Sequence, residues 1–213
     1  MKKTLITGAS RGIGLETAKL FLEKGWEVIG TSTTGHCKFK HPGLTIYALN
    51  LANSQSIKHF VNQLDSIDVL INNAAVLLDH WQEVKVNLDE LKKTFDINVF
   101  GTIELTESCL KKINKPGQII NIASGWGAFS SNDSSHAPSY KLSKVCLNMY
   151  TKLLAERLSN IIISSFDPGW VKTDMGTQSA PKLAATVAKE LYDLVHLPKK
   201  SGLFWHEGEI REW

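Results

Sequence analysis

The chain has 213 residues, enough for one α/β domain of good size and too few for two comfortable ones. Hydrophobic residues make up 43% and charged residues 21% of the chain, a composition expected of a soluble globular protein. The net charge is only +3, and Lys and Arg are scattered, which argues against nucleic acid as a partner.

Three widely spaced cysteines bear on the cellular compartment. Cys37, Cys109 and Cys146 are odd in number and form no CxxC pair, so they indicate reduced thiols in a cytoplasmic protein and not a disulfide framework. The same spacing predicts no metal site. The apolar run before Gly8 is too short for a signal peptide, and no other run reaches the roughly 18 residues of a membrane span. The sequence therefore predicts no membrane partner.

Apolar runs and helical stripes alternate along the chain. The predicted strands cover residues 4–7, 26–31, 44–49, 68–72, 118–123 and 161–166, with a final edge strand at 202–205. The predicted helices cover residues 15–25, 57–64, 88–113, 139–159 and 181–195, and a polar loop covers 33–43. A further loop that contains Trp81 leads to the helix at 88–113. The strands are continuous apolar runs, as in a parallel sheet that is buried on both faces. We therefore expect one doubly wound α/β domain of Rossmann type over residues 1–213, with helices on both faces.

The first strand-to-helix turn reads Thr7-Gly8-x-x-x-Gly12-x-Gly14. Glycines in a strand–turn–helix setting let the backbone approach a pyrophosphate, which then lies at the helix N-terminus. The turn has no Walker A lysine, which argues against nucleoside triphosphate hydrolysis. This turn predicts a dinucleotide site.

The region after the second strand bears on which dinucleotide binds. NAD sites usually carry Asp or Glu here, whereas residues 30–34 contain no carboxylate that would repel a 2′-phosphate. Arg11, inside the glycine loop, supplies a compensating cation, with His36 and Lys38 as weaker candidates in the following loop. The sequence therefore favours NADP(H) over NAD(H).

Tyr140 and Lys144 are four residues apart in a predicted helix and share one face. An ordinary tyrosine has a pKa of about 10, and a neighbouring cation lowers it. Exposed pairs of this kind are common on surface helices. The pair becomes informative only together with other parts of a site.

Several ordered motifs resemble those of the short-chain dehydrogenase/reductase family, over essentially the whole chain. They are the glycine loop, Asp68-x-Leu70-Ile71-Asn72-Asn73-Ala74, Asn98-Val99-x-Gly101, Ser124, Tyr140-x-x-x-Lys144 and Pro168-Gly169-Trp170-Val171-x-Thr173. The pattern Gly202-Leu203-Phe204-x-x-x-Gly208-x-x-x-x-Trp213 resembles the carbonyl-reductase-like and C-factor-like branch.

This resemblance implies an oxidoreductase that interconverts a carbonyl and an alcohol. Tyr140 would be the general acid or base, Lys144 would lower its pKa and hold the nicotinamide ribose, and Ser124 would hydrogen-bond the substrate oxygen. Asn98 would be the helix-kink asparagine that completes the catalytic set. Together with the glycine loop, the resemblance gives the cofactor-binding residues Gly8, Ser10, Arg11, Gly12, Ile13, Gly14, Ser32, Thr33, Asn50, Leu51, Asn73, Ala74, Ala75, Tyr140, Lys144, Pro168, Gly169, Val171 and Thr173.

The chain departs from the family pattern in three respects. Ala75 stands where glycine is usual, and Asn50 replaces the common acidic residue but still offers an acceptor to the adenine amino group. Ser124 and Tyr140 are 140 − 124 = 16 positions apart, and the extra residues fall in a polar segment at 130–135. None of these changes removes a reacting group.

A small-molecule substrate should lie beyond the carboxyl ends of the strands. The predicted pocket residues are Val76, Trp126, Phe129, Trp170 and Met175, which suggest an apolar carbonyl compound. The resemblance also implies that the helices at 88–113 and 139–159 pair with a second subunit in a homodimer or homotetramer. Their apolar residues Val99, Ile103, Leu147 and Leu154 are candidates for that contact or for internal packing.

Two other functional classes stay open. One is a nucleotide-binding regulatory or signalling protein that kept the fold without turnover, which has no need of a proton donor. The other is a sugar-nucleotide epimerase, which the lack of a larger substrate domain disfavours.

Overall fold

The computed structural model describes residues 1–80, 85–131, 134–197 and 200–213. Within these residues, one sheet has the strand order β10-β9-β6-β5-β4-β1-β2-β3, and all neighbours are parallel except β9 and β10. The strands are β1 (Lys3–Ile6), β2 (Glu27–Ser32), β3 (Leu44–Ala48), β4 (Ile67–Asn72), β5 (Ile113–Ile122), β6 (Ile161–Asp167), β9 (Leu203–His206) and β10 (Glu209–Ile210). This order confirms the predicted doubly wound Rossmann-type sheet.

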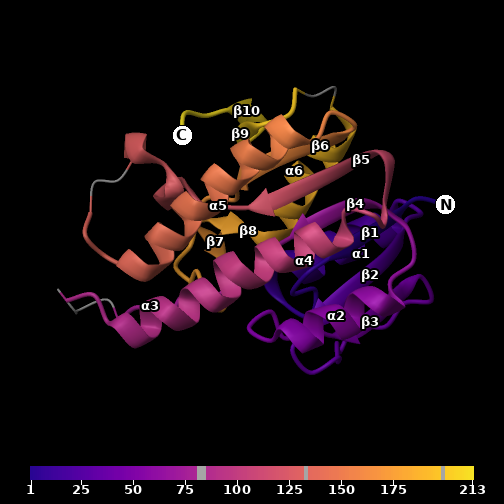
Figure 1. Cartoon of the computed structure of the whole chain (residues 1–213), viewed down its shortest axis with the longest axis horizontal. Helices are drawn as coiled ribbons and strands as arrows, with labels where there is room; N and C mark the ends of the chain where they lie inside the picture. The colour runs from indigo at the N-terminus through magenta and orange to yellow at the C-terminus, as the bar shows by residue number, and fades with distance from the viewer. Residues whose placement is uncertain (81–84, 132–133, 198–199) are drawn as a thin grey trace.

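Helices cover both faces of this sheet (Figure 1). They are α1 (Gly12–Glu23), α2 (Ser54–Gln63), α3 (Leu88–Phe95), α4 (Thr102–Cys109), α5 (Pro138–Arg157) and α6 (Ala184–His196). Helices α2, α4 and α5 pack on one face, and α1 and α6 pack on the other. Consecutive strand residues point to opposite faces, so Ile119 joins the first core and Ile120 the second. This double burial is the reason why the strands are continuous apolar runs.

A chain of buried polar side chains ties the sheet to two helices. Asn72 Nδ2 donates to Thr106 Oγ1 of α4 at 2.9 Å and to Asn121 Oδ1 of β5 at 2.8 Å. Asn121 Nδ2 in turn donates to Thr151 Oγ1 of α5 at 2.9 Å. The chain therefore joins α4, β4, β5 and α5 through the interior.

The predicted helix at 88–113 is wrong in its interior and at its end. A π-helical segment, η1 (Asp96–Gly101), separates α3 from α4, α4 ends at Cys109, and β5 begins at Ile113 instead of residue 118. In Figure 1 the segments form one continuous column in front of the sheet. A Cβ on Gly101 would lie 2.1 Å from the Leu51 carbonyl oxygen, so the glycine is needed for this close approach. A π-helical turn inside an α-helix often marks a functional site.

Two further boundaries differ from the prediction. The last long helix begins at Ala184 because Lys182–Leu183 form β8, which pairs with β7 (Val171–Lys172). The strand predicted at 202–205 is present as β9, but β10 and not β9 is the edge strand. The loop prediction for Trp81 falls outside the described residues.

Candidate functional site

The predicted site residues follow the carboxyl ends of parallel strands. The glycine loop follows β1, and Ser32 ends β2 with Thr33 after it. Asn50 and Leu51 follow β3, Asn73 to Ala75 follow β4, Ser124 follows β5, and Pro168 and Gly169 follow β6. The order of the strands reverses between β1 and β4, which is the crevice where ligands bind in such sheets.

The glycine loop has the geometry that its sequence predicts. Gly8 and Gly12 have φ angles of 67° and 55°, which favour glycine. A Cβ on Gly14 would lie 2.3 Å from the Gly8 carbonyl oxygen, so the turn closes tightly on the first turn of α1. Thr173 adjoins the loop, since a Cβ on Gly12 would be 3.3 Å from Thr173 Cγ2.

The loop after β4 fixes the glycine loop in place. Asn73 Nδ2 donates to the Thr7 carbonyl oxygen at 2.8 Å and to that of Gly8 at 3.3 Å. Thr7 Oγ1 accepts the backbone N–H groups of Asn73 and Ala74, both at 2.9 Å. The loops after β1 and β4, which contain predicted cofactor residues, thus form one hydrogen-bonded unit.

Arg11, the cation predicted for the 2′-phosphate, has a carboxylate partner in the structure. Arg11 Nη1 lies 2.8 Å from Asp174 Oδ2, and both side chains are more than two-thirds exposed. No local pattern indicated this partner, which lies 163 positions away. An exposed ion pair of this kind contributes little, and a phosphate can replace the carboxylate. Ser32 Oγ bonds the backbone of His36, which shapes the following turn.

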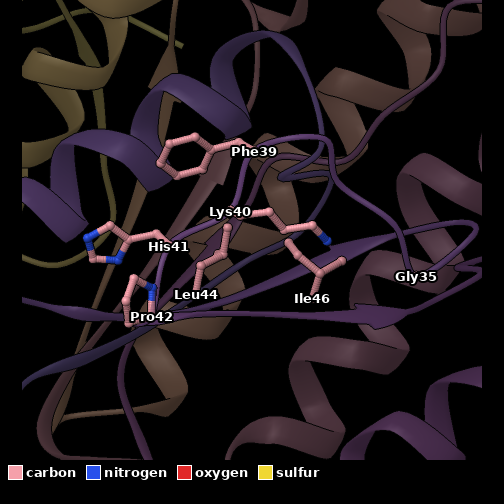
Figure 2. Close-up of a pocket in the computed structure, with 7 residues that line it drawn as sticks. All are labelled: Gly35, Phe39, Lys40, His41, Pro42, Leu44 and Ile46. Atoms are coloured by element: carbon pink, nitrogen blue, oxygen red, sulfur yellow. The ribbon is translucent and has the colours of Figure 1, made fainter.

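Asn50 is exposed, and its side-chain oxygen accepts the Ala52 N–H at 3.0 Å. A carbonyl oxygen has a second lone pair, so this bond leaves one acceptor site. A cavity of about 370 Å³ lies between the 35–42 loop and strand β3, at the edge of the sheet. Its lining residues are Gly35, Phe39, Lys40, His41, Pro42, Leu44 and Ile46. Figure 2 shows the Lys40 side chain extending across this cavity towards Ile46.

Tyr140, Ser124 and Lys144 come together as predicted. Ser124 lies close enough to the Tyr140 phenol to lower the pKa of that group. Lys144 Nζ lies 5.3 Å from the centroid of the Tyr140 ring and donates to the Ile122 carbonyl oxygen at 2.7 Å. One turn of α5 therefore presents a phenol and an amine to the end of β5.

Burial changes the proton affinities of this pair. Desolvation, followed by the negative charge of Asp167, raises the pKa of Tyr140, while the Ser124 hydrogen bond lowers it. This corrects the expected net lowering by Lys144, which a surface pair would show. Desolvation also lowers the pKa of Lys144 from 10.5 to about 8. Lys144 can therefore exchange a proton near neutral pH.

Asn98 lies in η1 and connects the loop after β4 to α5. Its side chain accepts the Val76 N–H and donates to the Val76 carbonyl oxygen, both at 2.8 Å. It also donates to Ser143 Oγ at 3.1 Å, and Ser143 donates to the Tyr140 carbonyl oxygen at 2.7 Å. Asn98 thus holds the backbone next to Tyr140.

Asp79 is a residue that the sequence reasoning missed. Its carboxylate accepts the backbone N–H groups of Ser139 at 2.8 Å and Tyr140 at 3.0 Å. The residue before the helix, Ala137, has no capping side chain and has a left-handed φ of 52°. Asp79 therefore caps the N-terminus of α5 from a distant loop, favourably for the helix dipole. The helical pattern around Tyr140 contains no signal for a cap so far away in sequence.

The predicted pocket residues lie at different depths. Trp126 packs edge-to-face on Tyr140, with ring centroids 6.2 Å apart, and Lys141 Nζ lies 5.1 Å from the Trp126 ring. Trp170 and Met175 are more than two-fifths exposed, and the Trp170 indole donates to the Gly176 carbonyl oxygen. Phe129 is 80% exposed and lies at the surface. Trp126 is therefore the pocket residue that the structure places against Tyr140.

Several solved structures share this architecture. The carbonyl reductase Sniffer of Drosophila melanogaster superposes with a TM-score of 0.90 at 26% identity, over 100% of both chains. A short-chain dehydrogenase/reductase structure from Burkholderia multivorans, solved with bound NADP, gives a TM-score of 0.91 at 24% identity. It covers 100% of this chain and 99% of that chain, and it supports the fold.

Sequence comparison agrees. The family model for short chain dehydrogenases matches residues 2–184. The 3-oxoacyl-[acyl-carrier-protein] reductase FabG of Aquifex aeolicus is 31% identical over 191 residues, which cover 82% of this chain and 75% of that protein. The fold and the glycine loop are those of the dinucleotide-binding oxidoreductases. Within that class, the chain belongs to the short-chain dehydrogenase/reductase family.

Two negative findings concern the described part of the chain. None of its helices is both long enough and apolar enough to cross a membrane. Within the same residues, no group of three or more His, Cys, Asp or Glu side chains is arranged to hold a metal ion.

Proposed function

We propose that the protein interconverts a carbonyl and an alcohol with NADP(H), with Tyr140 as the general acid or base. The observation that carries this proposal is the meeting of Tyr140 with Ser124 and Lys144 at the strand ends beyond the glycine loop. A regulator without turnover has no need of a phenol placed beside a serine and an amine.

The nicotinamide, when bound, supplies or accepts the hydride. In carbonyl reduction, Tyr140 donates its phenolic proton to the substrate oxygen, and Ser124 donates a hydrogen bond to the same oxygen as negative charge develops there. The raised pKa of Tyr140 keeps the phenol protonated and suits it as the acid in this direction. Lys144 would hold the nicotinamide ribose and, with a pKa of about 8, would return a proton to the phenolate afterwards.

The preference for NADP(H) rests on charge around the adenosine ribose. Thr33 and its neighbours after β2 present no carboxylate, and Arg11 is held only by an exposed partner. Lys40, in the loop after β2, offers a second cation at the cavity drawn in Figure 2. The structure from Burkholderia multivorans that shares the fold contains NADP.

The substrate is a carbonyl compound with an apolar or aromatic group. Trp126 forms an apolar wall against Tyr140, while Trp170 and Met175 lie exposed after β6, so the site is open on that side. Relatives with related activities include one named as a 3-oxoacyl reductase and one named as a carbonyl reductase.

A variant series tests this function. NADPH oxidation is followed over a panel of aldehydes, ketones and 3-oxoacyl thioesters, for the wild type and for Tyr140→Phe, and nucleotide affinity is measured from tryptophan fluorescence. We expect Tyr140→Phe to lose at least about 100-fold in kcat, the scale of general acid catalysis, while NADPH still binds. Strong residual turnover in this variant would refute the proposed acid. Tight NADPH binding without turnover of any carbonyl in the wild type would favour the regulatory alternative.

We also propose that the protein forms a homodimer or homotetramer through α5 and η1. Val99, Leu147 and Leu154 are buried and Ile103 packs partly buried against the core, so these four residues serve internal packing. The exposed apolar residues on the same segments are instead Phe100, Leu142, Met149 and Leu153. On α5 they follow at i, i+7 and i+11 and share a face. Leu153→Arg should halve the mass measured by sedimentation, whereas Lys152→Met should leave it unchanged.

The compartment that we propose is the cytoplasm. Cys37, Cys109 and Cys146 are all unpaired, as is usual where thiols stay reduced.

A further inference from the structure

A buried ionic cluster lies directly behind the proposed site. Asp167, the last residue of β6, is 3% exposed. Its Oδ2 forms an ion pair with Arg211 Nη1 and lies 3.2 Å from His206 Nδ1, which is also 3.1 Å from the Asp167 backbone oxygen. A buried carboxylate is stable only when it is paired, so Arg211 is the cation that Asp167 requires.

The cluster touches two segments of the site. Asp167 Oδ1 accepts the Gly169 N–H at 3.0 Å, which sets the turn after β6. On the other side, a Cβ on Gly125 would lie 2.9 Å from both Arg211 Nη1 and Asp167 Oδ2. Gly125 immediately follows Ser124. The ion pair is therefore packed against the backbone that carries the proposed substrate donor.

The C-terminal hairpin delivers both partners of Asp167. His206 ends β9, and Arg211 follows β10, where its N–H donates to the Phe204 carbonyl oxygen at 2.9 Å. The Arg211 guanidinium lies 5.2 Å from the Phe204 ring, on which Trp213 stacks with centroids 5.2 Å apart. The family match covers residues 2–184 and includes Asp167, whereas His206 and Arg211 lie beyond it.

We propose that Arg211 and His206 are positioning residues, which hold Asp167 and through it the Ser124–Gly125 and Pro168–Gly169 segments in reactive geometry. This inference rests on the proposed function. It extends the working site to the C-terminal hairpin, which lies beyond the residues that the family model matches.

Charge distinguishes this role from simple packing. Tyr140 faces Lys144 on its own helix, Ser124 after β5 and Asp167 from β6. Asp167 faces His206 and Arg211, and His206 is followed by Glu207 and its partner Lys182. After desolvation, the Asp167 charge is the second cause that raises the pKa of Tyr140. Arg211 balances that charge, so Arg211 and Asp167 should act as one unit.

The test uses Arg211→Met, Asp167→Asn and the double variant in the carbonyl reduction assay, with NADPH affinity measured in parallel. We expect Arg211→Met to lower kcat by about 10- to 100-fold, as for a small misplacement of reacting groups, while the affinity for NADPH changes much less. Asp167→Asn and the double variant should show the same difference between kcat and NADPH affinity, because the two side chains act as one unit.

Arg157→Met is the matched control. Arg157 also forms a carboxylate pair, with Glu107 at 2.8 Å, but it lies at the far end of α5. Its kcat and its affinity for NADPH should equal those of the wild type. Circular dichroism and the thermal midpoint check folding, and if Arg211→Met does not fold, Asp167→Asn provides the same comparison of kcat with NADPH affinity.

Two outcomes would overturn the proposal while leaving the proposed function intact. One is wild-type activity in Arg211→Met. The other is a loss of kcat in all three variants that is matched by an equal loss of NADPH affinity and a lower thermal midpoint, as a purely structural role requires. A wild type that reduces no carbonyl would overturn the proposed function and this inference together.

Discussion

Lys144 offers a quantitative test of how deeply the site is buried. The side chain is 2% exposed, and desolvation lowers its pKa from 10.5 to about 8. Because the pKa in the folded state is the lower one, the unfolded chain holds this proton more tightly. Above 10.5 the lysine is neutral in both states and costs nothing. The penalty grows as the pH falls through this window and is complete below about 8.

The size of the effect follows from linkage. Between about pH 10 and pH 7 the wild type should lose about 2.5 kcal/mol of unfolding free energy through this group alone. Lys144→Met has no titrating group at this position, so its unfolding free energy should fall by about 2.5 kcal/mol less than that of the wild type over the same pH range. The variant also loses the hydrogen bond to Ile122, a change of about 1 to 3 kcal/mol that is largely constant with pH.

Urea unfolding at several pH values, followed by tryptophan fluorescence without nucleotide, gives the comparison. Lys152→Met, on the exposed side of the same helix, is the control and should keep the pH dependence of the wild type. If wild type and Lys144→Met lose stability in parallel between pH 10 and pH 7, then Lys144 is not desolvated as the structure indicates.

Two other predictions concern the helix cap and the phosphate site. Asp79→Ala should lower the unfolding free energy by about 1 to 2 kcal/mol, through loss of the cap on α5, and should reduce kcat more than it changes nucleotide affinity. Urea titration and steady-state kinetics check it, and an unchanged kcat would contradict the link from this cap to Tyr140. Arg11→Ala and Lys40→Ala should each weaken NADPH by about 10-fold with little effect on NADH, because only NADPH carries the 2′-phosphate. Equal losses for both nucleotides, measured by fluorescence titration, would contradict the cofactor assignment.

Local sequence patterns predicted much of this molecule. The order of strands and helices follows from apolar runs and stripes, and the glycine loop is determined by residues within one turn. Tyr140 and Lys144 share a helix face because four residues make about one turn. These features need no knowledge of distant contacts.

The features that were missed depend on contacts between distant residues. The π-helical segment follows from the fit of Gly101 against Leu51, and no pattern within residues 88–113 indicates it. The cap by Asp79 on α5 joins residues 60 and 61 positions apart. The burial that raises the pKa of Tyr140 also arises from the assembled fold, so spacing alone gave the wrong direction.

The buried chain from Thr106 through Asn72 and Asn121 to Thr151 has a consequence for the accuracy of folding. Asn72 and Asn121 are direct partners across β4 and β5. Isoleucine side chains can replace one another in the packing, but a slip of one residue between β4 and β5 would place the two amides on opposite faces of the sheet and break the hydrogen bond between them. The two amides therefore specify the register between β4 and β5, which the surrounding isoleucines do not. Since Ser124 lies three residues after Asn121, and Thr151 lies on the helix of Tyr140, one correct alignment sets both ends of the site.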